Sequence, residues 1–276
     1  MARPKKRLGQ HFLFDPGILG RIADALDVGA GDTVLEIGPG PGGLTGQLAR
    51  RVGETGHLVA IEKDADMLPR LRAAYPGATL VEADALDADW HGLLGGLAGG
   101  SARAGRVLVT GNIPYNITSP LIDKALEPPL PARIVFLVQK EVADRVAARE
   151  GSKAYGALSV GVQAVCRVER LFTVPAGAFH PPPKVDSAVL RLTPLETPLV
   201  SEEERESFRR LVVGLFGFRR KQLLRGLREL TGWPAERVEV VLAAASLRPD
   251  VRPEVLDPGS FARLHARLVD EGWRTG

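Results

Sequence analysis

The chain has 276 residues, of which 45% are hydrophobic and 25% are charged. This composition is typical of a globular protein with a core of its own, and it excludes a disordered or fibrous chain. The length is more than one hydrophobic core usually accommodates, so we expect two domains of unequal size. The formal net charge of +3 is compatible with an anionic partner but does not establish one.

The residue types also exclude several classes of site. Cys166 is the only cysteine, which excludes an internal disulfide and a zinc site made of several cysteines. The histidines have no metal-ligand spacing to other ligands, so we predict no metal. No apolar run is long enough to span a membrane, and no apolar signal segment follows the basic start of the chain. We therefore expect a cytoplasmic protein without a membrane partner.

The first predicted element is a helix that starts after Asp15. Asp15 serves as the N-cap, Pro16 takes the first helical position, and apolar residues follow at helical spacing. Short apolar runs, typical of buried strands, then alternate with segments of helical periodicity. We predict strands at residues 33–37, 57–61, 79–81, 106–110 and 133–138, and helices at residues 44–51, 65–74 and 119–126. The alternation indicates βαβ units, and so an α/β fold with a doubly wound, mainly parallel sheet.

The composition changes near Pro194 and Pro198, after a strand-like segment at residues 188–192. Four segments of helical periodicity follow, separated by glycine and proline, at residues 202–215, 222–230, 235–244 and 260–269. We therefore expect residues 1–195 to form the larger α/β domain and residues 196–276 to form a small all-helical domain.

A glycine-rich segment at residues 38–43 follows the first predicted strand and opens a helix. Glycine at such a turn, here Gly38 and Gly40, lets the backbone approach a ligand closely. Glu62 ends the next strand, at the spacing where a carboxylate meets the hydroxyls of a ribose. These residues predict a nucleotide-like ligand, but alone they do not choose between NAD and S-adenosylmethionine.

Two details favour S-adenosylmethionine. Pro39 and Pro41 remove amide donors that a dinucleotide pyrophosphate would use, whereas a sulfonium amino acid has no phosphate to bind. Asp84 follows the third strand, in position to accept a hydrogen bond from the adenine amino group of the cofactor. Taken singly, Asp84 is also compatible with a helix cap or a loop. Together with the glycines and Glu62, it indicates a cofactor site.

The segment Asn112-Ile113-Pro114-Tyr115 ends a strand, at the edge where open α/β sheets bind ligands. An aromatic amine is a poor nucleophile because its lone pair is conjugated with the ring. The Asn112 side-chain oxygen and the Ile113 carbonyl can accept the two N6 hydrogens of adenine and favour a pyramidal nitrogen, while Tyr115 stacks on the base. The alternative is a turn with a core tyrosine. Beside a cofactor site, the segment predicts N6 methylation of adenine, with Asn112, Pro114 and Tyr115 as catalytic residues.

Two further features point to nucleic acid. Phe179 precedes three prolines that would hold it rigidly, so we predict that it stacks on the other face of a flipped-out base, although it could equally be a core residue. A basic cluster interrupts an apolar helical pattern in the second domain, which favours nucleic acid over a merely solvated face. The predicted RNA-binding residues of this cluster are Arg219, Arg220, Lys221 and Arg225.

These motifs together resemble those of the bacterial KsgA-type small-subunit rRNA adenine N6,N6-dimethyltransferases. The resemblance rests on five segments in order: residues 7–13, the glycine-rich segment, residues 112–115, 179–187 and 218–221. It implies a Rossmann-like S-adenosylmethionine methyltransferase domain with a helical C-terminal domain. It also implies dimethylation of two adjacent adenines near the 3′ end of 16S rRNA, during maturation of the 30S ribosomal subunit. We expect the protein to act as a monomer.

The resemblance also carries over site residues. It implies that the cofactor is bordered by His11, Leu13, Gly38, Glu62, Asp84 and Asn112. His11 stands where such proteins often have asparagine, and residues 218–221 depart from the commoner Asn-Gln-Arg-Arg-Lys form. These two departures affect the hydrogen bond at position 11 and the RNA-binding role of the basic segment.

Three alternatives share parts of the pattern. A methyltransferase of large-subunit rRNA that confers macrolide resistance shares the Asn-Ile-Pro-Tyr chemistry, but the helical domain and residues 179–185 favour the small-subunit group. A non-catalytic RNA-binding assembly or transcription factor on the same fold is disfavoured because the site residues are intact. A DNA adenine methyltransferase is disfavoured only by the resemblance.

Overall fold

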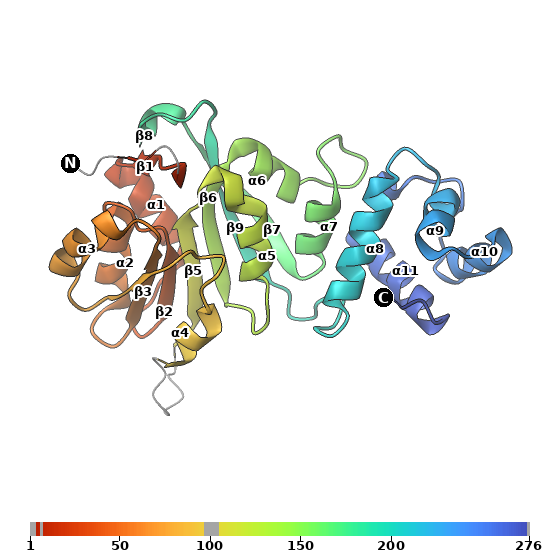
Figure 1. The fold of residues 1–276 in the computed structure, drawn as a ribbon, viewed down its shortest axis with the longest axis horizontal. Coiled ribbons are helices and arrows are strands. Elements are labelled where there is room, and N and C mark those ends of the chain that lie inside the picture. Colours follow the sequence, from red (N-terminus) through yellow and green to blue (C-terminus); the bar gives the residue numbers. More distant parts are fainter. Residues whose placement is uncertain (1–3, 6–7, 97–104, 275–276) are drawn as a thin grey trace. The chain divides into compact units, whose positions relative to one another are not determined.

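The structure is a computed structural model that describes residues 4–5, 8–96 and 105–274. The chain divides into two compact units (Figure 1). We call residues 1–143 with 169–194 the sheet unit, and residues 144–168 with 195–276 the helical unit.

The sheet unit is built on seven strands in the order β4-β3-β2-β5-β6-β9-β7. The strands are β2 (Thr33–Ile37), β3 (His57–Glu62), β4 (Thr79–Glu82), β5 (Val107–Asn112), β6 (Arg133–Gln139), β7 (Cys166–Val174) and β9 (Ser187–Pro194). Neighbouring strands from β4 to β6 pair in parallel, and β9 joins β6 in antiparallel register. The predicted mainly parallel sheet is therefore confirmed.

Helices flank this sheet (Figure 1). They are α1 (Pro16–Leu26), α2 (Gly43–Val52), α3 (Leu68–Ala74), α4 (Trp90–Gly96), α5 (Thr118–Ala125) and α6 (Lys140–Val146). The Asp15 side chain caps α1 by accepting the Ile18 N–H at 2.9 Å, as the sequence predicts. The buried face of α1, which includes Leu19 and Ile22, packs in one apolar cluster with α2 and the sheet. This packing fixes where the loops at the carboxyl ends of the strands lie.

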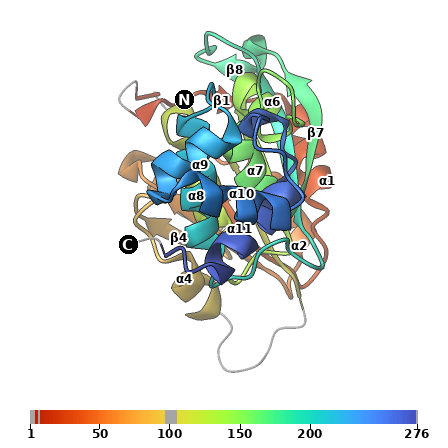
Figure 2. The same cartoon turned by 90° about the vertical axis from the view of Figure 1, so that its right-hand side faces the viewer.

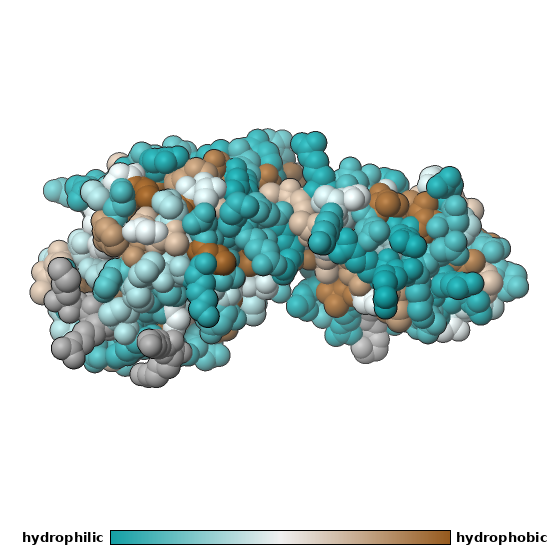
Figure 3. Space-filling view, turned by 90° about the horizontal axis from the view of Figure 1, so that it is seen from above, coloured by the Kyte–Doolittle hydropathy of each residue, from teal (hydrophilic) through white to brown (hydrophobic). Residues whose placement is uncertain are grey.

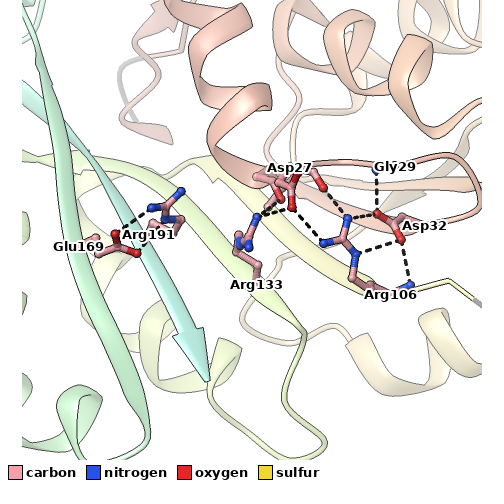
Figure 4. Close-up of polar contacts among 8 residues, drawn as sticks. Asp27, Gly29, Asp32, Arg106, Arg133, Glu169 and Arg191 are labelled. Atoms are coloured by element: carbon pink, nitrogen blue, oxygen red, sulfur yellow. Dashed lines mark hydrogen bonds and ion pairs between the residues drawn. The ribbon is translucent and has the colours of Figure 1, made fainter. Parts of the chain in front are cut away.

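Ion pairs tie the amino ends of three parallel strands together (Figure 4). Arg106, just before β5, binds Asp27 at 3.1 Å and the buried Asp32 at 2.8 Å. Arg133, the first residue of β6, binds the same Asp27 carboxylate at 2.9 Å. Asp32 also accepts the Gly29 N–H, so its oxygens are well satisfied. These ion pairs lie at the end of the sheet opposite to the carboxyl ends of the parallel strands, where open α/β sheets bind ligands.

The helical unit contains α7 (Ala157–Gln163), α8 (Arg205–Gly217), α9 (Leu223–Thr231), α10 (Ala235–Ala244) and α11 (Pro258–Asp270), seen face-on in Figure 2. We predicted its start at residue 196, but residues 144–168 also belong to it. The physical reason is that this segment is tied to the C-terminal helices. The buried Tyr155 hydroxyl donates to the Leu256 carbonyl at 2.8 Å, and the Gly151 N–H donates to the Glu254 carbonyl at 2.7 Å.

The surface seen from above is mainly hydrophilic, and its apolar residues form separate small patches (Figure 3). Within the described ranges, no helix combines the length and the apolarity needed to cross a membrane.

Candidate active site

A cavity lies at the carboxyl ends of β2, β3, β4 and β5, and its empty space measures about 910 Å³ including the open mouth. The residues that line it come from the loops after these strands and from residues 8–12. Of the predicted site residues, it brings together His11, Gly38, Gly40, Glu62, Asp84, Asn112, Pro114 and Tyr115. The carboxyl ends of parallel strands meet at one edge of a sheet, which explains why residues far apart in the sequence converge there.

The glycine-rich loop joins β2 to α2 in a backbone conformation that requires glycine. Gly38, Gly40 and Gly42 have φ angles of 65°, 53° and 91°, a region that side chains rarely adopt. At Gly42, a Cβ atom would also lie 2.8 Å from the ring of Tyr75. The loop therefore exposes bare backbone to the cavity at Gly38 and Gly40.

The amide groups of this loop are already used. The Gly38 N–H donates to the Ile61 carbonyl at 2.9 Å, and the Gly42 N–H donates to the Pro39 carbonyl at 3.0 Å. The Gly40 N–H donates to the Glu62 carboxylate at 2.9 Å, and prolines have no N–H. Residues 38–42 thus offer no free donor to a pyrophosphate, which favours a ligand without phosphate over a dinucleotide.

Two carboxylates line the cavity beside the loop. Glu62 is buried and accepts the Asp64 N–H at 2.8 Å in addition to the Gly40 N–H, and burial raises the pKa of its carboxyl group. Asp84 accepts the Leu86 N–H at 3.0 Å and pairs with Lys63 at 2.5 Å, and Lys63 lowers its pKa. Each carboxylate oxygen can accept a second hydrogen bond. The pair can therefore accept hydrogen bonds from ribose hydroxyls and an adenine amino group, and their negative charge suits a cationic ligand.

The Asn112 side chain has a defined orientation at the end of β5. Its Nδ2 donates to the His11 carbonyl at 2.8 Å. A carbonyl oxygen can only accept, so the Asn112 amide nitrogen must face His11 and its Oδ1 is left as an acceptor. Because Asn112 lines the cavity, the chain presents an oriented acceptor to a ligand there.

Tyr115 and His11 form an aromatic wall next to Asn112. Their ring centroids lie 5.5 Å apart with an interplanar angle of 20°. The Tyr115 hydroxyl hydrogen-bonds with the Ser187 Oγ at 2.7 Å, and burial raises the pKa of Tyr115. His11 Nδ1 lies 2.8 Å from the Pro181 carbonyl, so this nitrogen carries the hydrogen. Contacts on both rings fix them, which suits a surface on which a planar base stacks.

Leu13 and Phe179 lie in a short ribbon that the sequence did not predict. Strand β1 (Phe12–Leu13) pairs in antiparallel register with β8 (Phe179–His180). Leu13 lines a second, smaller cavity, which shares Gly38, Gly40 and Asn112 with the first. Phe179 lines neither cavity; it is 2% exposed and packs in the apolar cluster with α1. The structure therefore does not bring Phe179 to the site, and its stacking role stays a prediction that requires the ribbon to move.

The predicted RNA-binding residues lie in the helical unit and differ in their contacts. Arg219 binds Glu254 at 2.6 Å and donates to the Lys153 carbonyl at 3.2 Å. Lys221 binds Glu229 at 2.8 Å. Arg220 and Arg225 are exposed. No ion pair to either of these two arginines is found in the part of the chain that the structure describes.

Several residues near the site were not predicted. Lys63 pairs with Asp84, Ser187 meets Tyr115, and Lys5 and Gln10 bind Asp64 next to Glu62. The available sequence signal was that Gln10 and Ser187 lie in residues 7–13 and 179–187, two of the segments that carry the resemblance. The described residues contain no group of three or more histidine, cysteine or acidic side chains that could hold a metal ion.

The cavity fits S-adenosylmethionine on its own features: a glycine loop whose amide donors at residues 38–42 are already used, two carboxylates at its side, and an oriented amide oxygen. Comparison with known proteins agrees. Residues 1–258 match the family described as ribosomal RNA adenine dimethylase. The ribosomal RNA small subunit methyltransferase A of Acidithiobacillus ferrooxidans is 43% identical over 283 residues, covering 100% of this chain and 98% of that protein.

Two solved structures are also similar. A dimethyladenosine transferase from Plasmodium falciparum superposes with a TM-score of 0.81 at 26% identity, covering 95% of this chain and 98% of that one. The 23S rRNA methyltransferase ErmE gives a TM-score of 0.70 at 28% identity, covering 94% of this chain and 99% of that one. The sequence match and the geometry of the cavity agree, and the chain belongs to the ribosomal RNA adenine dimethylase family.

Proposed function

We propose that this chain uses S-adenosylmethionine to dimethylate the N6 atoms of two adjacent adenines near the 3′ end of 16S rRNA. The orientation of Asn112 is the observation that carries the proposal, since its Nδ2 is held by the His11 carbonyl and its Oδ1 is left as an acceptor on a residue that lines the cavity. The relatives that are alike over the whole chain are named small-subunit methyltransferases, which favours the small-subunit rRNA as substrate.

The residues around Asn112 perform the chemistry by positioning. Asn112 Oδ1 and the Ile113 carbonyl accept the two N6 hydrogens and draw the nitrogen lone pair out of conjugation with the ring. Tyr115 stacks on the base, held by His11 and Ser187. When bound, S-adenosylmethionine supplies an electrophilic methyl group on a sulfonium centre. The amine can lose its proton after transfer, so no strong base is needed.

Other residues that line the same cavity would hold the cofactor. Glu62 accepts the ribose hydroxyls through the free lone pairs of its oxygens, and Asp84 accepts the adenine amino group. Gly38 and Gly40 provide close backbone contact. The Asp84 carboxylate already pairs with the Lys63 ammonium group. The adenine amino group would either bind the carboxylate together with Lys63 or displace it. Leu13 contributes apolar contact from the adjoining smaller cavity.

We propose that the partner is the immature 30S subunit, bound by a monomer in the cytoplasm, where ribosomal subunits assemble. Arg220 and Arg225 are the residues best suited to contact RNA phosphates, because they are exposed and form no ion pair with a carboxylate among the described residues. Arg219 and Lys221 are partly neutralised by Glu254 and Glu229. Arg219 also binds the Lys153 carbonyl, so it holds the fold of this region together.

The double substitution Arg220→Ala with Arg225→Ala is expected to weaken binding of 30S subunits and to flatten its dependence on salt. Each lost phosphate contact lowers the slope of log K against log salt by about 0.7–0.9. Binding is measured over a series of salt concentrations. Arg267→Ala, which removes an exposed arginine paired with Asp270 on α11, is the control. A double variant with the slope of the wild type would contradict the assignment.

The function is tested by incubating the purified protein with labelled S-adenosylmethionine and one of three substrates: unmethylated small ribosomal subunits, large subunits or duplex DNA. Modified nucleosides are then identified by mass. The proposal expects N6,N6-dimethyladenosine in small-subunit rRNA alone. The similarity to ErmE makes large-subunit rRNA the second candidate, which label in that RNA would establish. Tight binding of subunits without any transfer would indicate a non-catalytic assembly factor instead.

A further inference from the structure

Asp64 is a buried carboxylate whose partners come from the start of the chain. Its side chain is 0% exposed. Lys5 Nζ lies 2.5 Å from Oδ1, and Gln10 Nε2 donates to Oδ2 at 3.0 Å. Both polar atoms of the Gln10 side chain form hydrogen bonds, because its Oε1 accepts the backbone N–H of Lys5 at 2.7 Å. We call these three residues the Asp64 anchor.

The anchor adjoins the proposed cofactor site. The Asp64 N–H donates to Glu62 at 2.8 Å, and the other Glu62 oxygen accepts the Gly40 N–H. Residues 8–12, of which Gln10 is one, line the cavity. The anchor is therefore one hydrogen bond away from the carboxylate that we assign to the ribose.

Residues 8–13 are held at their far end by different contacts. The His11 carbonyl accepts the Asn112 amide, and Phe12 and Leu13 pair with β8. Between the two ends, Gly9 has a φ of 63°, which lets the chain turn. The backbone ladder and the buried Leu13 fix one end. At the other end, the contacts to Asp64 come from the side chains of Lys5 and Gln10.

The strength of the anchor comes from burial. A buried carboxylate is costly unless it is paired and hydrogen-bonded, so Asp64 strongly favours the arrangement in which Lys5 and Gln10 reach it. The Lys5 side chain is 30% exposed, so salt and water can compete for it.

We infer that Lys5 and Gln10 are positioning residues for the cofactor: by binding Asp64 they hold residues 8–12 in place as a wall of the cavity. The inference rests on the proposed function, because it takes this cavity as the S-adenosylmethionine site. If only anchored molecules are competent to bind, the apparent Kd equals the intrinsic Kd divided by the anchored fraction. Weakening the anchor therefore raises the Kd. Once the site is saturated, the bound ligand itself favours the anchored state, so kcat is unchanged.

The test uses the full chain with Lys5→Met and Gln10→Ala, and titrates S-adenosylhomocysteine by calorimetry. Methionine keeps the apolar stem of lysine and removes only the charge. We expect each variant to bind about tenfold more weakly at low salt, as for a tenfold drop in the anchored fraction. Kd should also rise less steeply with salt in Lys5→Met than in the wild type. Lys5→Arg should restore binding.

Arg51→Met is the control, because it removes an ion pair to the exposed Asp24 at 2.6 Å, away from the cavity, whereas Lys5 pairs with both the buried Asp64 and the exposed Asp66. This control should bind S-adenosylhomocysteine as the wild type does. Unchanged Kd values and salt dependence in Lys5→Met and Gln10→Ala would overturn the inference.

Hydrogen exchange separates this inference from the proposed function. The Leu8 N–H, which donates to the Lys5 carbonyl at 3.0 Å, should exchange faster in both anchor variants and at the wild-type rate in Arg51→Met. This readout needs no ligand. If the wild type binds no S-adenosylhomocysteine, the proposed cofactor is wrong, and the exchange rates alone then decide whether the anchor holds the wall. Unchanged exchange rates would contradict the anchor even if the wild type binds.

Discussion

Asn112→Ala is expected to lower the rate of methyl transfer at saturating cofactor by about 10²–10³, the usual effect of losing one oriented hydrogen-bonding group at a reacting atom. The wild-type Asn112 uses its Nδ2 to bind the His11 carbonyl, which leaves Oδ1 for the substrate amine. Alanine removes both contacts, so the adenine nitrogen would keep its conjugated, planar geometry. Single-turnover rates with unmethylated small subunits measure this directly.

Two further substitutions test whether the effect depends on the orientation of the Asn112 side chain. Asn112→Asp keeps two acceptor oxygens but cannot donate to the His11 carbonyl when ionised, so we expect it to be nearly as slow as alanine. Ser187→Ala removes the partner of the Tyr115 hydroxyl and leaves the ring in place, so its loss should stay below about tenfold, as for a single neutral hydrogen bond. An Asn112→Ala enzyme that keeps more than a tenth of the wild-type rate would show that Asn112 does not align the amine.

The sheet and most of the cavity were predictable because both depend on local pattern. Continuous apolar runs mark the parallel strands, and the residues that follow each run meet at one edge of the sheet. This is why Glu62, Asp84 and Asn112 were found from their positions after strands, and why all three line one cavity. The positive φ of Gly38 and Gly40 likewise has a direct sequence signal.

Contacts that depend on tertiary distance had no such signal. Gln10 and Asp64 are 54 residues apart, and Arg219 and Glu254 are 35 apart. Phe179 shows a second reason why part of the site could not be predicted from the sequence. Its strand has two residues, too few for an alternating pattern to show which side chain faces inward. In the structure Phe179 is buried and His180 is exposed.

The domain boundary was also difficult to predict from the sequence. Helix α7 has only seven residues, and it precedes the last two strands of the sheet. A prediction that follows the sequence in order assigns such a short segment to the same domain as the strands on either side of it. Its buried Ser159 and Val160 instead belong to the helical unit. Composition cannot reveal that a short segment belongs to the other unit, because both units are built from the same kinds of apolar residue.

Glu36 is the residue for which we expect the largest effect of pH on stability. It is 1% exposed, it lies on β2 next to the glycine loop, and its Oε2 has no hydrogen-bond partner among the described residues. Burial raises its pKa from 4.5 to about 8, and the nearby Glu62 adds to the rise. The folded state therefore binds a proton more tightly than the unfolded state does, over the range between these two values.

The sign of the effect follows from this difference. Below the unfolded pKa the carboxyl group is protonated in both states and does not penalise folding. As the pH rises from about 4.5 to about 8, the unfolded state ionises first, so the free energy of unfolding falls; above about 8 the loss is complete. At 1.36 kcal/mol for each unit of pKa difference, the total loss is on the order of 3–5 kcal/mol.

Glu36→Gln should remove this loss, because glutamine has nearly the same shape and does not ionise. Urea unfolding of wild type and variant, without cofactor, gives the difference in unfolding free energy at each pH. We expect the free energy of unfolding of the variant, relative to that of the wild type, to increase steadily from pH 5 to pH 8. Asp27→Asn tests the opposite sign: Arg106 and Arg133 lower the pKa of Asp27, so its contribution should disappear only as the pH falls below about 4. A difference for Glu36→Gln that stays constant from pH 5 to pH 8 would mean that Glu36 is ionised in its buried position, and that a cation or a solvent path reaches it there.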